Sequence, residues 1–235
     1  MINLENNFNN IVQDPFPHVY VENFFQEEFL KKLNDSFPKM PDKDSEMFGR
    51  KKIPNFKKGG LSEDWRELNI FLESPEFYIK LFQSFKNCYA DDVKIDFNKR
   101  VRVTSNDQYN SKIDYNGYND FFMYYDISEA STGYFREVHR DTDKRFINFL
   151  IYLNSPQISG GELVLYSSNK DTIHERQYPT NVDIAKVIPP IGNTALFFLS
   201  NKQSYHSVNV ISECQTSRRF IYGSITSHNR SGVWK

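Results

Sequence analysis

The stretch that decides the fold is HRDTDKRFINFL, residues 139–150. Its second half is a run of apolar, β-branched and aromatic residues that is typical of a buried strand. Its first half places His139 and Asp141 two positions apart, and side chains two apart in an extended segment project to the same side. We therefore predict that His139 and Asp141 can hold one metal ion at the end of a strand.

The chain on both sides of this stretch also has the pattern of strands. After Asp91, short segments rich in β-branched and aromatic residues follow one another with no helical pattern between them. The nine predicted strands cover residues 100–104, 120–126, 134–139, 145–153, 162–166, 185–188, 195–199, 207–211 and 218–226. A half-chain made of strands alone predicts a sandwich or a barrel, so the fold class is mainly β.

The first ninety residues have a different pattern. Apolar residues at helical spacing predict helices over residues 24–33, 62–74 and 74–88, which we expect to pack on the outer face of the β structure. Residues 38–60 lack periodicity and carry seven Lys or Arg against three acids, which predicts a long basic loop. We expect one domain, 1–235, with a polar arm 1–13, a helical support 14–90, a β core 91–226 and a tail 227–235.

Composition excludes several classes of protein. The formal net charge is −1, so no overall field draws the chain to nucleic acid or to an anionic membrane. No apolar run of about 18 residues and no signal-peptide pattern is present, which predicts a soluble cytoplasmic protein. The two cysteines, Cys88 and Cys214, are too few for a disulfide framework and lack metal-ligand spacing.

A third metal ligand is available further along the chain. His206, 67 residues after His139, begins the alternating segment HSVNVI, which is typical of a strand. Two imidazoles and one carboxylate on one face of an octahedral metal leave three open positions, the arrangement that suits a non-haem Fe(II) oxygenase. Arg218 opens another strand twelve residues later, and an arginine fork can bind a carboxylate co-substrate through two parallel bonds.

These residues belong to a longer ordered pattern over residues 120–226. Its pieces are His139-x-Asp141, FLIYLN (149–154), SGGELVLY (159–166), PPIGNTALFF (189–198), His206-x-Val208 and Arg218. In this order they resemble the 2-oxoglutarate/Fe(II)-dependent dioxygenases of the prolyl hydroxylase type. The resemblance implies a double-stranded β-helix core (jelly-roll or cupin-like) with iron held by His139, Asp141 and His206. It also implies Fe(II), 2-oxoglutarate and O₂ as cofactor and co-substrates, with ascorbate as a possible reductant.

The resemblance further implies a pocket for 2-oxoglutarate. Arg218 pairs there with the distal carboxylate, Tyr152 hydrogen-bonds the same group, and Tyr125 lines the pocket, with Tyr124 as the alternative. Arg219 is the alternative to Arg218, because neighbouring strand residues project to opposite faces.

The alternation of side chains along the strand gives a second reason to consider Tyr152 as a contact of the co-substrate. It places Phe146, Asn148, Leu150 and Tyr152 on one face of their strand, so Asn148 is also a candidate contact of the co-substrate.

For the activity we expect hydroxylation of an unactivated C–H bond. The resemblance suggests a prolyl or other amino-acid residue in a protein or peptide, with the loops 38–60 and 105–119 as candidate rims of the substrate site. A free amino acid or another small metabolite is the main alternative substrate. From a different class, the chain could be a catalytically silent binding module on the same scaffold. The sequence leaves the oligomeric state open.

Overall fold

The structure is a computed structural model. It describes residues 2–3, 8, 10–54, 60–91, 93, 95–96, 98–103, 117–168 and 177–227, without the side chains of residues 103 and 118–120. Part of the predicted arm, most of the predicted tail, part of the basic loop 38–60 and most of the loop 105–119 lie outside the described residues.

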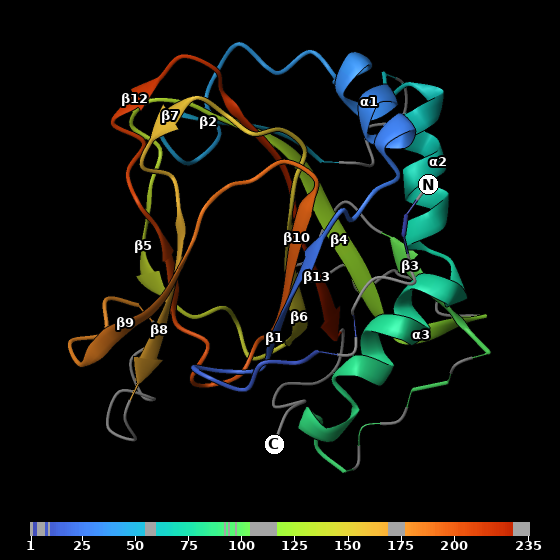
Figure 1. The fold of residues 1–235 in the computed structure, drawn as a ribbon. Helices are drawn as coiled ribbons and strands as arrows, with labels where there is room; N and C mark the ends of the chain where they lie inside the picture. Colours follow the sequence, from blue (N-terminus) through green and yellow to red (C-terminus); the bar gives the residue numbers. More distant parts are fainter. Residues whose placement is uncertain are drawn as a thin grey trace.

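Two β-sheets face each other and form the centre of the molecule (Figure 1). The larger sheet has the order β1 (His18–Glu22), β10 (Thr194–Leu199), β6 (Arg145–Tyr152), β13 (Arg218–Ser227), β4 (Tyr118–Ala130), β2 (Arg50–Pro54), with β3 (Arg100–Val103) parallel to β4. The smaller sheet has the order β5 (Arg136–His139), β11 (His206–Val208), β8 (Leu163–Ser168), β9 (Val182–Ile188). A short pair, β7 (Ile158–Ser159) and β12 (Glu213–Cys214), lies at one end. This is the predicted double-stranded β-helix.

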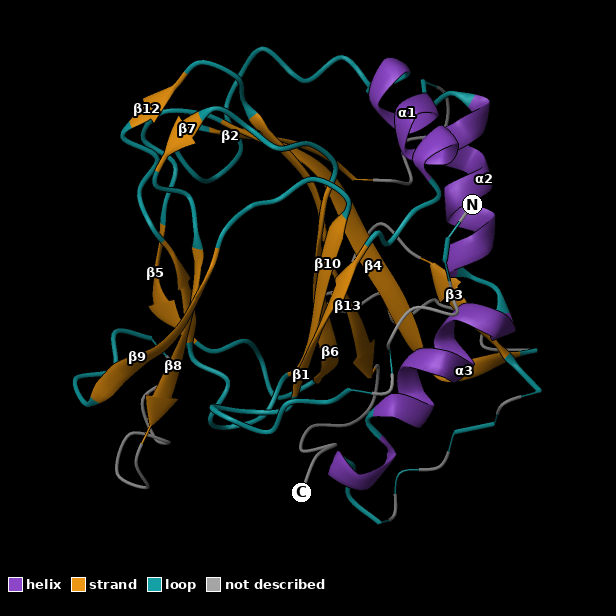
Figure 2. Ribbon diagram, in the orientation of Figure 1, coloured by secondary structure: helices purple, strands orange, loops and turns teal. Residues whose placement is uncertain are grey.

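Helices cover the outer face of the larger sheet, as predicted (Figure 2). They are α1 (Glu27–Asp35), α2 (Glu63–Leu72) and α3 (Pro75–Ser84), followed by the 3₁₀ turn η1 (Lys86–Cys88). Each helix turns an apolar stripe inward, which buries Leu33, Trp65 and Phe82 against the sheet. No helix within the described ranges is long and apolar enough to cross a lipid bilayer.

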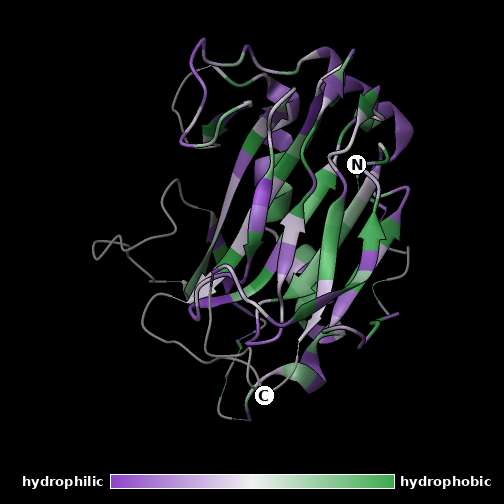
Figure 3. Cartoon of the chain, turned by 90° about the vertical axis from the view of Figure 1, so that its left-hand side faces the viewer, coloured by the Kyte–Doolittle hydropathy of each residue, from purple (hydrophilic) through white to green (hydrophobic). Residues whose placement is uncertain are grey.

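Alternation along each strand of the larger sheet divides the interior into two cores. On β6, Ile147, Phe149 and Ile151 pack toward the helices, while Leu150 and Tyr152 face the smaller sheet. Figure 3 shows hydrophobic residues along many of these strands and hydrophilic residues at their connections. The side chains on the inner face of the larger sheet therefore form one wall of the space between the sheets.

All nine predicted strands are present, with shifted ends. The prediction for Phe146 is wrong, because its ring packs against Phe82 and Phe121 in the helix-side core. The prediction of a continuous loop over 38–60 is also wrong, because β2 pairs with β4. Residues 50–54, RKKIP, lack a strand pattern. Their extended conformation is stabilised by pairing with the distant strand β4 and not by local propensity.

Candidate metal centre and active site

Three side chains meet where β5 and β11 pair in the smaller sheet. His139 and His206 are register partners across this pair, and their ring centroids lie 4.3 Å apart. Asp141 follows β5 after one residue, and its Oδ2 atom lies 3.7 Å from Nε2 of His206. One ligand atom from each of the three residues lies within 4.8 Å of the others. The fold thus brings together the three predicted ligands.

Backbone carbonyls fix the orientation of both imidazoles. Nδ1 of His139 lies 2.8 Å from the carbonyl oxygen of Glu137, and Nδ1 of His206 lies 2.9 Å from that of Ser204. A carbonyl only accepts, so each Nδ1 carries the proton and each Nε2 keeps its lone pair. Both rings present to the centre the atom that binds a metal.

Electrostatics keep the histidines neutral and the carboxylate charged. Burial, helped by the neighbouring His206, lowers the pKa of His139 to about 3. Burial also lowers the pKa of His206, although Asp141 acts in the opposite direction. For Asp141, burial alone would raise the pKa, but Arg145 and the two histidines outweigh it and lower it to about 2. At neutral pH the three groups are therefore in the protonation states that a metal requires.

The two oxygens of Asp141 have different surroundings. Oδ1 lies 3.1 Å from Nη1 of Arg145, whereas Oδ2 is buried without a hydrogen-bond partner in the described structure. A buried carboxylate oxygen without a partner is costly unless a cation satisfies it. Two imidazole nitrogens and this oxygen form the donor set of a non-haem Fe(II) site, so the residues fit that metal.

A cavity of about 270 Å³ extends from this centre between the two sheets. Arg218 lines it and is completely buried, with its guanidinium donating to the carbonyl of Gly161 at 2.7 Å and to the hydroxyl of Tyr152 at 3.4 Å. Its Nε has no hydrogen-bond partner, and Arg218 forms no ion pair with any carboxylate in the described ranges. A buried guanidinium in this state is suited to an anionic ligand.

Arg219 lies on the other side of the strand. It is 3.6 Å from Glu129, and its guanidinium lies over the ring of Phe37. Of the two neighbouring arginines, only Arg218 therefore lines the cavity.

The carbonyl that holds Arg218 belongs to a tight turn that requires glycine. Gly160 has φ +85°, and a Cβ atom there would lie 1.9 Å from the carbonyl oxygen of Val210. Gly161 follows with φ +79° and accepts the bond from Arg218. The SGG segment thus fixes the position of the arginine in the cavity.

The expectation for Tyr125 is wrong. Tyr125 points away from the cavity and donates to the side chain of Asn69 on α2 at 3.3 Å. Tyr124 lines the cavity in its place, because the two residues alternate on β4.

The other two predicted contacts lie beside the cavity. Tyr152 is buried against Arg218, and burial raises its pKa in spite of that cation. The Oδ1 of Asn148 lies 3.3 Å from Nη1 of Arg145, and its Nδ2 is buried without a hydrogen-bond partner in the part of the chain described.

Three polar residues of the cavity, Arg50, Asp126 and Tyr222, were not predicted from the sequence. Arg50 of β2 and Asp126 of β4 form a buried ion pair at 2.6 Å. Burial disfavours the charge of Arg50, but Asp126 outweighs it and raises its pKa. Tyr124 donates to the second oxygen of Asp126 at 3.2 Å, and Tyr222 accepts a short hydrogen bond from Arg145. No local pattern predicts the pairs Arg50–Asp126 and Arg145–Tyr222, because their members lie 76 and 77 residues apart in the sequence.

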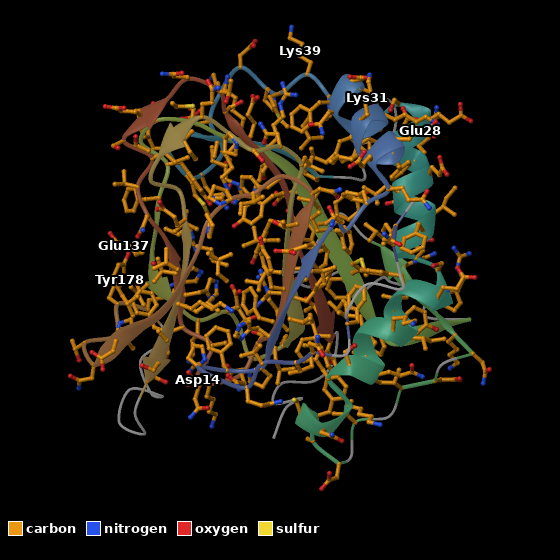
Figure 4. The ribbon with its side chains drawn as sticks, in the orientation of Figure 1. Asp14, Glu28, Lys31, Lys39, Glu137 and Tyr178 are labelled. Atoms are coloured by element: carbon orange, nitrogen blue, oxygen red, sulfur yellow. The ribbon has the colours of Figure 1, made fainter. Side chains whose placement is uncertain are left out.

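A second hollow of about 450 Å³ adjoins the first on the outer side of β5. The two share Glu46, Met47, Arg136 and His139. Around the second hollow stand three exposed aromatic side chains, Phe48 (75% exposed), Phe135 (47%) and Tyr178 (68%). Figure 4 shows Glu137 and Tyr178 close to each other on this side of the molecule.

Comparisons with known proteins relate the β region to one family. Residues 121–225 match the family model of the 2OG-Fe(II) oxygenase superfamily. No curated protein sequence matches the chain.

Solved structures share the fold. An oxidoreductase of the 2OG-Fe(II) oxygenase family from Burkholderia pseudomallei has a TM-score of 0.57 at 13% identity, covering 92% of this chain and 86% of that one. A Pseudomonas putida prolyl-4-hydroxylase has a TM-score of 0.50 at 13% identity, covering 89% and 91%. HygX from Streptomyces hygroscopicus, with nickel, 2-oxoglutarate and hygromycin B bound, has a TM-score of 0.52 at 6% identity, covering 92% and 84%.

Proposed function

We propose that this protein is a 2-oxoglutarate- and Fe(II)-dependent dioxygenase that hydroxylates a prolyl or other amino-acid residue within a protein or peptide. The match of residues 121–225 to the family model of the 2OG-Fe(II) oxygenase superfamily supports the class of reaction. The observation that carries the proposal is the pair of adjoining hollows, of which one contains the metal ligands and the other is rimmed by exposed aromatic residues.

The metal ligands in this proposal are His139, Asp141 and His206. When bound, Fe(II) supplies oxidation of a C–H bond by O₂, coupled to decarboxylation of 2-oxoglutarate to succinate. The two histidines hold the metal through Nε2 because backbone carbonyls occupy Nδ1. Asp141 supplies Oδ2, while Arg145 keeps Oδ1 occupied and the carboxylate in one orientation.

Arg218 is the proposed partner of the distal carboxylate of 2-oxoglutarate. Three observations support this role: Arg218 is completely buried, it has no ion-pair partner among the residues that the structure describes, and it lines the cavity that contains the metal ligands. Tyr152 and the carbonyl of Gly161 hold the guanidinium in place. We propose Tyr124 as a further residue of this pocket, since its side chain lines the cavity.

The sizes of the hollows favour a peptide over a small metabolite. Ligand sites have volumes of roughly 300–1,000 Å³, and the inner cavity of about 270 Å³ must also hold 2-oxoglutarate. The space that remains suits one side chain. An extended chain can place that side chain at the metal while its neighbours lie along the outer hollow and its aromatic rim.

The test is mass spectrometry of peptides incubated with the enzyme, Fe(II), 2-oxoglutarate and O₂. We expect a peptide product that is heavier by one oxygen atom, with succinate formed in equal amount. His139→Ala and Asp141→Ala should abolish both products, whereas Asp183→Ala, which removes an exposed carboxylate of β9, should retain them.

Two results would contradict the proposal. Oxidation of free amino acids with no product from any peptide would show that the substrate is a small metabolite. Unchanged succinate formation in Asp141→Ala would show that the three residues do not form the catalytic centre.

A further inference from the structure

We propose that the peptide substrate carries an acidic side chain within about two residues of the hydroxylated position, and that Arg136 binds its carboxylate. This inference rests on the proposed function. It concerns the place where the two hollows meet, because Arg136 lines both of them.

The charges around the inner cavity are unequal. Five cationic side chains line it: Arg50, Lys52, Arg136, Arg145 and Arg218. Three carboxylates line it: Glu46, Asp126 and Asp141. Fe(II) adds two positive charges and 2-oxoglutarate brings two negative charges, so loading the site leaves the excess of two positive charges unchanged. A substrate with a negative charge is therefore complementary to the loaded site.

Arg136 is the cation that remains after each of the other four cationic side chains has been assigned a partner. Arg50 pairs with Asp126, Lys52 with Glu46, and Arg145 with Asp141. Arg218 is the proposed partner of 2-oxoglutarate. Among the described residues, the guanidinium of Arg136 donates hydrogen bonds to Nε2 of His139 at 3.4 Å and to the sulfur of Met47 at 3.7 Å, and it forms no ion pair.

The position of Arg136 limits where the carboxylate can lie. Its guanidinium reaches a metal-ligating nitrogen at 3.4 Å, so an acid that it binds lies close to the oxidised carbon. An extended peptide advances about 3.3 Å per residue, which places this acid within about two residues of the hydroxylated one. The exposed rings of Phe48 and Phe135 line the same outer hollow as Arg136 and can hold apolar residues next to the acid.

The first experiment is a degenerate peptide library with blocked termini, so that side chains supply the only carboxylates. After incubation with the loaded enzyme, sequencing of the hydroxylated members should show enrichment of Glu or Asp within two positions of the modified residue. One hit is then made in three versions that carry Glu, Gln or Lys at that position.

Binding of the three versions is measured without turnover, by fluorescence anisotropy with anaerobic enzyme containing Fe(II) and 2-oxoglutarate. A charge-assisted bond predicts that the Glu peptide binds about tenfold more tightly than the Gln peptide. Arg136→Gln should remove this preference, and Arg136→Glu should reverse it toward the Lys peptide. The control Arg100→Gln removes an arginine of β3 that pairs with Glu73 and should keep the preference.

The outcomes separate this inference from the proposed function. Hydroxylation of library members without acidic enrichment, or equal affinities for the Glu and Gln peptides, would overturn the role of Arg136 and leave the peptide hydroxylase standing. A library without any hydroxylated member would overturn both. A preference for Glu that survives in Arg136→Gln would assign the carboxylate to another residue and overturn the inference.

Discussion

Arg145 lies 3.1 Å from one oxygen of Asp141, while the other oxygen faces Nε2 of His206 at 3.7 Å. One oxygen is thus held by an arginine, and the other is left for a metal. The arginine also donates to Tyr222 and Asn148, so the guanidinium that holds the carboxylate is itself held in place.

Replacing this arginine should weaken the metal site. Loss of a group that orients a metal ligand costs about 10- to 100-fold in metal affinity, so we expect that loss for Arg145→Met, measured by anaerobic titration with Fe(II). The affinity of Arg145→Lys for Fe(II) should lie between the affinities of Arg145→Met and the unchanged protein. Equal affinities in all three proteins would show that Asp141 is positioned without Arg145.

The neighbouring arginines of β13 give a paired test of the co-substrate site. Arg218→Gln should raise the KM for 2-oxoglutarate by at least about tenfold, because a charge-assisted pair with a carboxylate is lost. Arg219→Gln should leave this KM unchanged, since Arg219 contacts Glu129 and Phe37 outside the cavity. Succinate formation at varied 2-oxoglutarate concentration measures both. The reverse pattern would assign the co-substrate to Arg219.

The two tyrosines of β4 should respond differently to loss of their hydroxyls. Tyr125→Phe removes the hydrogen bond to Asn69 and should lower the free energy of unfolding by about 1 kcal/mol without changing kinetic constants. Tyr124→Phe removes a group from the cavity and should raise a KM, for 2-oxoglutarate or for the peptide. Chemical denaturation and steady-state kinetics measure the two effects. Altered kinetics in Tyr125→Phe alone would contradict the assignment.

Acid should destabilise the metal-free protein over a defined range. Burial lowers the pKa of His18, His139 and His206, so below about pH 6.5 the unfolded chain takes up protons that the folded chain does not. For His139, whose pKa is lowered to about 3, this difference costs about 1.4 kcal/mol of stability between pH 7.5 and 5.5, and His18 and His206 act in the same direction. The stabilising contribution of Asp141 is present above its ordinary pKa and is lost as the pH falls toward 2.

Thermal unfolding at pH 7.5 and 5.5 measures this effect. The Tm should fall at pH 5.5, and the fall should be smaller in His139→Gln, which lacks the histidine whose pKa is lowered to about 3. A Tm that is equal or higher at pH 5.5 would contradict the neutral state of these histidines.

The parts of the site that were predictable from sequence depend on local patterns. His139 and Asp141 stand two apart beside a run of apolar residues, and the nearly continuous apolar segment of β6 shows a buried strand without any knowledge of its neighbours. The glycines of the SGG turn show a tight turn in the same way.

The remaining features depend on contacts between distant residues. Arg50 is buried because Asp126, 76 residues away, neutralises it, and nothing in the segment RKKIP shows that pairing. The choice between Tyr124 and Tyr125 depends on which face of β4 meets the helices, which is a property of packing. The periodicity of the sequence shows that Tyr124 and Tyr125 project to opposite faces of the strand, but it does not show which of these faces lines the cavity.

Arg136 and a bound metal compete for one nitrogen of His139. Arg136 donates to Nε2 of His139 at 3.4 Å, and a metal at the centre needs the same lone pair. Metal binding therefore releases the guanidinium, and a carboxylate that draws the guanidinium away uncovers the ligand. The two affinities are thermodynamically linked, so an acidic peptide should tighten metal binding by the same factor by which the metal tightens peptide binding. An enzyme with this linkage assembles its oxidising centre most completely when its substrate is present.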